Sequence, residues 1–179
     1  VGGVIPGSGA ALNFGLQTTV GTYTVGAVNT ITGCSGNMSN SVTVSVNSLP
    51  SAFAMSTSGS FCTGGTGWLV GLAGSQVGVN YQLLLGGAPV SGAVLSGTGG
   101  PLSYGLRTTP GNYTVVATNT TTGCTATMTG TTVVSVNALP TVYTMTGGGA
   151  YCSGTTVGVP VGLNGSQTGV NYQLYRGTT

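Results

Sequence analysis

The sequence predicts an all-β protein made of tandem antiparallel β-sandwich modules of about 90 residues each. Three observations support this prediction. Short runs alternate between apolar and polar residues with a period of two, and glycine or asparagine bounds each run. No run has the period of a helix. A stretch of about 40 residues is also repeated further along the chain, which indicates an array of similar units.

The repeat defines the organisation of the chain. Residues 12–50 align without a gap with residues 102–140, which lie 90 positions later. Both stretches end in a similar seam, VNSLP or VNALP, in which proline ends a strand ladder and holds the preceding residue extended. We therefore divide the chain into the C-terminal part of one repeat, a complete repeat and the N-terminal part of the next: residues 1–50, 51–140 and 141–179.

A second repeated phrase lies closer to the start of each copy. GSQVGVNYQL at residues 74–83 returns as GSQTGVNYQL at residues 165–174, now 91 positions later because one residue has been added in between. In this alignment Val1 corresponds to Ser91, and Thr179 corresponds to Ala88. We therefore expect the chain to be a segment of a much longer repetitive protein.

Five strands of the complete repeat can be placed from their patterns. In order, we expect them at residues 68–74, 79–85, 101–106, 111–119 and 131–137. Alternation in the second strand puts Val79, Tyr81 and Leu83 on one face, and Asn80 and Gln82 on the other. The first and fourth strands each place three residues on one face in the same way: Trp68, Val70 and Leu72, and Tyr113, Val115 and Ala117.

About seven short strands in a unit of this length, with frequent turn signals, fit a sandwich of the immunoglobulin type. The five placed strands then correspond to strands B, C, E, F and G of that fold. Tyr23 and Tyr113, near the start of strand F in each copy, take the place of a tyrosine corner. A β-solenoid is disfavoured because its coils repeat every 20 to 30 residues or so, and no such period is present.

The composition argues against most chemical functions. The sequence has no Asp, Glu or His, and its two formal side-chain charges are Arg107 and Arg176. General acid–base and nucleophilic catalysis need a titratable base, so we expect no enzyme activity and no catalytic residue. Without carboxylates, histidines or a CxxC pair, we expect no metal site and no cofactor. The lack of a basic cluster and of an 18-residue apolar run argues against nucleic-acid binding and membrane insertion.

Each copy carries two cysteines at matching positions, which suggests disulfides in an oxidising compartment. The simplest pairing joins Cys62 with Cys124 and leaves Cys34 and Cys152 to partners outside the segment. Such a bridge would stabilise the repeat by about 4 kcal/mol. In a regular sandwich these positions lie at opposite poles, so bridges between neighbouring modules are the alternative. Buried free thiols are a third interpretation.

The aromatic residues allow two interpretations. Trp68 could be a platform on which a sugar ring stacks, but its phase with Val70 and Leu72 favours core packing. In the next copy a valine, Val159, replaces it. Tyr81 and Tyr172 are likewise expected in the core, with hydrogen-bonded hydroxyl groups. No ligand-binding residue is assigned from the sequence.

Several motifs together resemble a known repeat family. They read FCTGGTG, GLAGSQVGVNYQLLL, LSYG, GNYTVVATN, TGC and VSVNALP in this chain. This set resembles the immunoglobulin-like repeats of very long secreted surface proteins of Bacteroidota. The resemblance implies export through the type IX secretion system, an extracellular or cell-surface location, and a role in adhesins or surface fibres. It brings no catalytic residues, and the near absence of charge here departs from the family pattern.

These observations lead to one expected function and one alternative. We expect a structural repeat of an extracellular filament or cell-surface adhesin, acting as fibre body or spacer, with neighbouring repeats and other copies of the protein as partners. An uncharged surface favours lateral association, because no net charge opposes it. The alternative is an adhesive module whose loops bind a glycan or a surface.

Overall fold

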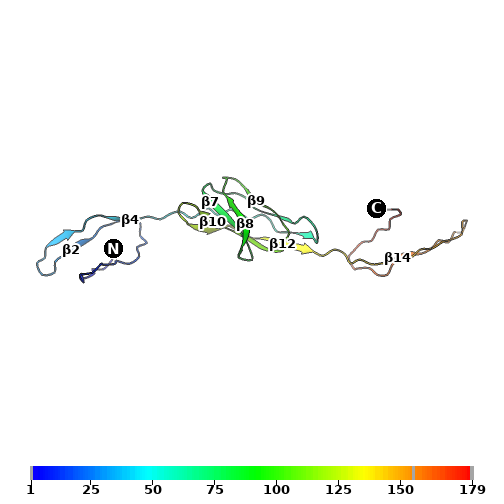
Figure 1. Cartoon of the computed structure of the whole chain (residues 1–179), viewed down its shortest axis with the longest axis horizontal. Coiled ribbons are helices and arrows are strands. Elements are labelled where there is room, and N and C mark those ends of the chain that lie inside the picture. The colour runs from blue at the N-terminus through cyan, green and yellow to red at the C-terminus, as the bar shows by residue number, and fades with distance from the viewer. Residues whose placement is uncertain (1, 155, 178–179) are drawn as a thin grey trace.

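The computed structural model describes residues 2–154 and 156–177. The described residues form fourteen β-strands and no helix, which confirms the all-β prediction. The chain is drawn out along one axis in three parts (Figure 1). We call them the N-terminal segment (residues 1–50), the central segment (residues 51–140) and the C-terminal segment (residues 141–179).

The central segment contains two sheets. The larger has five strands in a path, and β11 (Thr125–Thr127) pairs with β10 beside it. The path runs through β5 (Gly59–Cys62), β12 (Thr132–Asn137), β10 (Gly111–Asn119), β7 (Val79–Leu85) and β8 (Ala88–Ser96). The smaller sheet pairs β6 (Trp68–Leu72) with β9 (Leu102–Arg107). Every pairing is antiparallel except that of β5 with β12, which is parallel.

Apolar side chains from both sheets form one hydrophobic core between them. The larger sheet contributes Val79, Tyr81 and Leu83 from β7, and Tyr113, Val115 and Ala117 from β10. The smaller sheet contributes Val70, Leu72, Leu102 and Tyr104. The hydroxyl of Tyr104 donates a hydrogen bond of 3.0 Å to the carbonyl oxygen of Tyr81 and so ties the two sheets together. The inward faces expected for β7 and β10 are therefore confirmed.

Strand β6 departs from simple alternation. Its residues Val70, Gly71 and Leu72 are all buried, and its register against β9 shifts between Leu69 and Gly71, where Tyr104 and Gly105 of β9 lie opposite Val70. Trp68 is half-buried and packs against the edge of the core. A bulge of this kind places two residues of one strand opposite one residue of its partner and bends the strand.

Strand β5 brings the chain back beside β12. Its glycine is required by contact, because a Cβ atom at Gly59 would lie 2.2 Å from atoms of the Trp68 ring. The indole nitrogen of Trp68 donates to the carbonyl oxygen of Thr57 at 2.9 Å. The backbone before and within β5 therefore covers this side chain.

The two end segments repeat the local pairings of the central segment. In the N-terminal segment β1 (Gly21–Tyr23) pairs with β4 (Val42–Val44), and β2 (Gly26–Val28) pairs with β3 (Ser35–Asn37). In the C-terminal segment β13 (Met145–Gly147) pairs with β14 (Val161–Leu163). The pairs Gly21–Val44 and Gly111–Val134 lie at equivalent positions of the repeat. The hydrophobic core, however, lies entirely within the central segment.

Candidate functional site

The repeated GSQ phrase lies beside the seam and holds the first residue of its own segment by a hydrogen bond. The side-chain oxygen of Gln76 accepts from the backbone nitrogen of Ser51 at 2.6 Å, directly after the Leu-Pro seam. The backbone nitrogen of Gln76 donates to the Tyr81 hydroxyl at 2.8 Å. Gln76 thus connects Ser51, the first residue of the central segment, to the core residue Tyr81.

The same contacts recur in the next copy. The side-chain oxygen of Gln167 accepts from the backbone nitrogen of Thr141 at 3.0 Å, and its own backbone nitrogen donates to the Tyr172 hydroxyl at 2.9 Å. Because this pattern is retained in both copies, we regard the two glutamines as seam anchors. The side-chain oxygen and the backbone nitrogen of each glutamine are hydrogen-bonded within the chain.

The glycine of the same phrase is fixed by a close contact with an aromatic ring. A Cβ atom at Gly74 would lie 2.6 Å from Cδ1 of Phe53, and one at Gly165 would lie 2.6 Å from Cε1 of Tyr143. A larger residue would push the ring away from the seam. The GSQ phrase therefore holds the start of its own segment in place, directly after the seam.

Both expected tyrosine corners are present. The hydroxyl of Tyr113 donates to the carbonyl oxygen of Thr109 at 2.8 Å, and that of Tyr23 donates to the carbonyl oxygen of Thr19 at 2.8 Å. Each bond joins the tyrosine side chain to the backbone four residues earlier, and so holds the turn that precedes the strand.

The disulfide expected between Cys62 and Cys124 is not formed, and both side chains are free thiols. Cys62 ends β5 opposite Asn137, near the C-terminal seam, whereas Cys124 follows the far end of β10. The nine residues of β10 span about 26 Å, while a disulfide needs Cα atoms within about 7 Å. The sequence reasoning missed the parallel pairing of β5, which holds Cys62 at the opposite pole.

The remaining two cysteines lie away from both. Cys34 is exposed in the turn between β2 and β3, and Cys152 is exposed between β13 and β14. Cys62 lies toward the C-terminal segment, and Cys124 lies toward the N-terminal segment. Bridges between neighbouring repeats, the alternative pairing, therefore stay a hypothesis.

Tyr104 is the side chain with a clearly altered acidity. Its ring is buried against Tyr81, and burial raises the pKa of its hydroxyl to about 12. The neighbouring Tyr81 raises this pKa further, and Arg107 partly opposes the effect. Since the hydroxyl stays protonated and hydrogen-bonded across the sheets, its role is structural.

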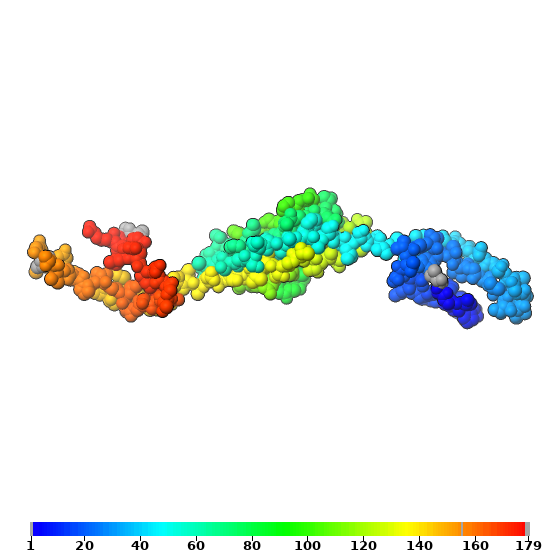
Figure 2. All heavy atoms as spheres, turned by 180° about the vertical axis from the view of Figure 1, so that it is seen from behind, coloured from blue at the N-terminus to red at the C-terminus, as the bar shows by residue number. Residues whose placement is uncertain are grey.

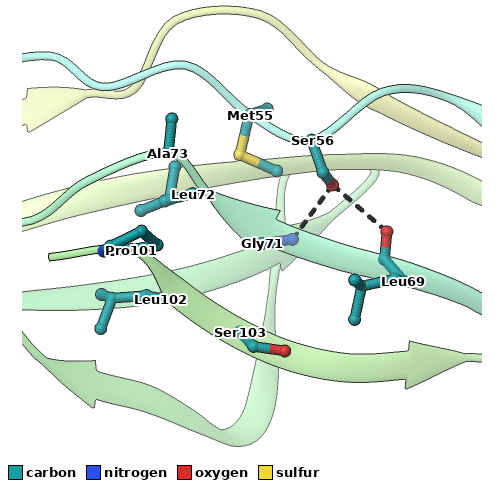
Figure 3. Close-up of a pocket in the computed structure, with 9 residues that line it drawn as sticks. All are labelled: Met55, Ser56, Leu69, Gly71, Leu72, Ala73, Pro101, Leu102 and Ser103. Atoms are coloured by element: carbon teal, nitrogen blue, oxygen red, sulfur yellow. Dashed lines mark hydrogen bonds between the residues drawn. The ribbon is translucent and has the colours of Figure 1, made fainter.

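A shallow depression of about 340 Å³ lies over β6 and β9 (Figure 3). Its lining consists of Met55, Ser56, Leu69, Gly71, Leu72, Ala73, Pro101, Leu102 and Ser103. The Ser56 hydroxyl already donates to the Leu69 carbonyl oxygen at 3.2 Å and accepts from the Gly71 nitrogen at 3.1 Å. The lining has no titratable side chain, so it offers a reaction neither a base nor a nucleophile.

The described residues contain no group of three or more His, Cys, Asp or Glu side chains that could hold a metal ion. Among the described residues there is no helix long and apolar enough to cross a membrane. Comparison with protein-family models and with curated proteins finds no match for the chain.

Proposed function

We propose that this chain is a structural repeat segment of a long extracellular filament or cell-surface adhesin, acting as fibre body or spacer. In this proposal it consists of immunoglobulin-like modules of about 90 residues. The chain would be exported by the type IX route that its motifs imply.

The observation that carries the proposal is the serial arrangement of the segments along one axis (Figure 1). The first residue after each seam is held by the same glutamine contact within its own segment, so further repeats could be added in the same manner. Arrays of this kind make contacts mainly between neighbours and grow in length without a new fold. Such growth suits a spacer.

The strand order supports the immunoglobulin-like assignment. In this assignment β7, β10 and β12, which are neighbours in one sheet, would be strands C, F and G, and β8 would be C′. Strands β6 and β9, which pair in the other sheet, would be B and E. The tyrosine corner before β10 fits the same scheme.

The adhesive alternative receives less support. Trp68, the candidate sugar platform, is half-buried, hydrogen-bonded to Thr57 and packed against Gly59. A stacking platform needs an exposed ring face, so we assign Trp68 to packing.

Electron microscopy of the natural protein purified from its source tests this proposal. We expect a continuous fibre whose axial repeat equals one or two modules. Discrete globular particles without such a repeat would contradict a fibre body or spacer.

A further inference from the structure

The two cysteines of the central segment lie at its opposite poles, and each borders a turn at that end of the segment. Cys62 ends β5, and the turn at residues 63–65 follows it on the side of the C-terminal segment. Cys124 closes the hairpin between β10 and β11 on the side of the N-terminal segment. A narrow stretch of chain joins the central segment to its neighbour at each pole (Figure 2). The two thiols therefore lie near two different seams.

Cys62 is held beside the strand that leads into the seam at Pro140. Its partner in the parallel pairing of β5 with β12 is Asn137, which belongs to the VNALP seam itself. The backbone nitrogen of Thr63 donates to the carbonyl oxygen of Asn137 at 2.9 Å, and its hydroxyl donates to the same oxygen at 3.1 Å. The Cys62 side chain is exposed. This thiol is therefore fixed next to the seam and open to a partner there.

Cys124 approaches the preceding seam from its other side. The chain that leaves that seam runs parallel to the residues that follow Cys124, because Ala54 and Thr129 form a parallel bridge. In this bridge the backbone nitrogen of Thr129 donates to the carbonyl oxygen of Phe53 at 2.9 Å. Continued back over equal numbers of residues, this parallel course brings Cys124 level with Leu49 of the VNSLP seam.

The hairpin that carries Cys124 forms in both copies. The backbone nitrogen of Asn119 donates to the carbonyl oxygen of Cys124 at 2.9 Å, and that of Asn29 donates to the carbonyl oxygen of Cys34 at 2.8 Å. The hydrophobic core lies in the central segment, so the hairpin around Cys34 forms without it. Each repeat therefore presents this thiol at the same place by local structure alone.

Because the two seams are equivalent, both placements can be compared on one of them. Asn137 corresponds to Asn47, which precedes Leu49 by two positions. In consecutive repeats, a cysteine equivalent to Cys62 lies level with Asn47, and Cys124 lies level with Leu49. Their offset along the extended seam is about 6.6 Å. A disulfide needs Cα atoms within about 7 Å, so the two positions are compatible with a bond.

We propose that a disulfide crosses each seam and joins the Cys62 position of one repeat to the Cys124 position of the next. This inference deepens the proposed function and rests on it, since the two cysteines belong to neighbouring repeats of an array. The same placement that separates Cys62 from Cys124 within a repeat brings the two types together between repeats. Each seam receives one cysteine of each type, so the pairing uses both thiols of every repeat inside the array.

The bond requires an oxidant. The two S–H bonds break and one S–S bond forms, which releases two protons and two electrons. A disulfide oxidant such as oxidised glutathione takes them up by thiol–disulfide exchange and becomes two thiols. Oxidants of this class act in the compartments in which secreted proteins form disulfides.

A cysteine placed in the first seam of the 179-residue chain tests the position of Cys124. Leu49→Cys should form a disulfide with Cys124 in oxidised glutathione, because the two residues are level. Digestion without reduction, followed by mass spectrometry, detects the linked peptide, which has two hydrogen atoms fewer than its parts. An introduced cysteine that links to Cys34 or Cys62 instead, or to no cysteine, would overturn the proposal.

Ser48→Cys is the matched control for this experiment. Its side chain points to the opposite face of an extended chain, so it should give at least about tenfold less peptide linked to Cys124. Equal yields from both variants would show that the link reflects chance encounters, and would overturn the assigned register. At the other seam, Asn137→Cys should link to Cys62, its partner in the β5–β12 register. Failure of that link would equally contradict the placement of Cys62.

The natural protein tests the pairing itself. After alkylation of free thiols and digestion without reduction, the peptide that contains Cys62 should be linked to a TGC peptide of the following repeat. The sequences around this motif differ between the two copies, TGCSGN and TGCTAT, so the mass of a linked peptide distinguishes such repeats. Cys62 linked to Cys124, or recovered in alkylated form, would overturn the proposal.

This outcome is distinct from failure of the filament function. Continuous fibres with alkylated cysteines would overturn the disulfide alone. Cross-linked repeats in discrete globular particles would contradict a fibre body or spacer and leave the disulfide in place.

Discussion

The central and end segments have similar sequences but differ in what they bury. Tyr23 and Tyr113 make the same corner hydrogen bond, and Gln76 and Gln167 make the same seam contact. Tyr81, in contrast, is 0% exposed, whereas Tyr172 is 43% exposed. Turns, corners and hairpins are therefore encoded within about half a repeat, whereas the core needs both halves. A local sequence pattern can be satisfied without producing a stable sandwich.

The largest expected difference between the segments comes from truncating equivalent leucines. Leu83→Ala removes a fully buried side chain and should lower the free energy of unfolding by about 2–5 kcal/mol. Leu174→Ala removes an exposed one and should change it by less than about 0.5 kcal/mol. The chain has one tryptophan, Trp68 in the central segment, so its fluorescence in denaturant titrations at low protein concentration reports this unfolding. Equal effects of both substitutions would contradict the comparison.

The second difference concerns pH. Since the chain has no Asp, Glu or His, the stability of the central segment should be constant between about pH 5 and pH 7. Above pH 10 the unfolded chain loses the Tyr104 proton, while in the folded chain a pKa of about 12 retains it. Stability should then fall between pH 10 and pH 12 by on the order of 2 kcal/mol.

Tyr104→Phe separates this effect from general alkaline damage. The variant loses the hydrogen bond to Tyr81, which should cost about 1 kcal/mol at neutral pH. It should also lose most of the decrease between pH 10 and pH 12, because the titrating hydroxyl is gone. Denaturant titrations at each pH measure both effects, and an unchanged alkaline decrease in the variant would contradict our account. Phenylalanine stands at the equivalent position of the N-terminal segment, as Phe14.

The smallest effect should come from the seam anchors. Gln76→Ala removes the acceptor for the Ser51 nitrogen and should cost about 0.5–1.5 kcal/mol. Gln167→Ala does the same for Thr141, but within a segment that has no core, so it should leave the unfolding of the central segment unchanged. Faster hydrogen exchange of the Ser51 or Thr141 amide, respectively, is the direct measurement. Unaltered exchange at both amides would show that the glutamines do not anchor the seam.

The sequence predicted the strands that alternate and missed those that do not. The alternating residues of β7 and β10 were placed on the correct faces, because half-buried strands in a two-sided sheet impose a period of two. Strand β5 has the sequence GSFC and depends on parallel pairing with a strand about 70 residues away, so no local pattern identifies it. Strand β8, the edge strand of the larger sheet, was also missed, because its proline and glycine interrupt the pattern of a regular strand.

The candidate sites were predicted less well than the fold. The Cys62 to Cys124 pairing failed because the position of Cys62 depends on β5. The corner tyrosines were predicted correctly because their hydrogen bonds are local. The inward faces of β7 and β10 were also predicted correctly. The role of Gln76 was missed, since nothing in the phrase itself shows that its side chain reaches back 25 residues to Ser51. Recurrence of the phrase in both copies was the available signal.

Hydrogen exchange of the 179-residue chain tests most directly whether the central segment holds the closed core while the end segments keep only local pairings. At low concentration, we expect amides of β7 and β10 to be protected, while those at residues 23–28 and 170–174 exchange rapidly. Protection of either end region equal to that of β7 and β10 at low concentration would contradict the account.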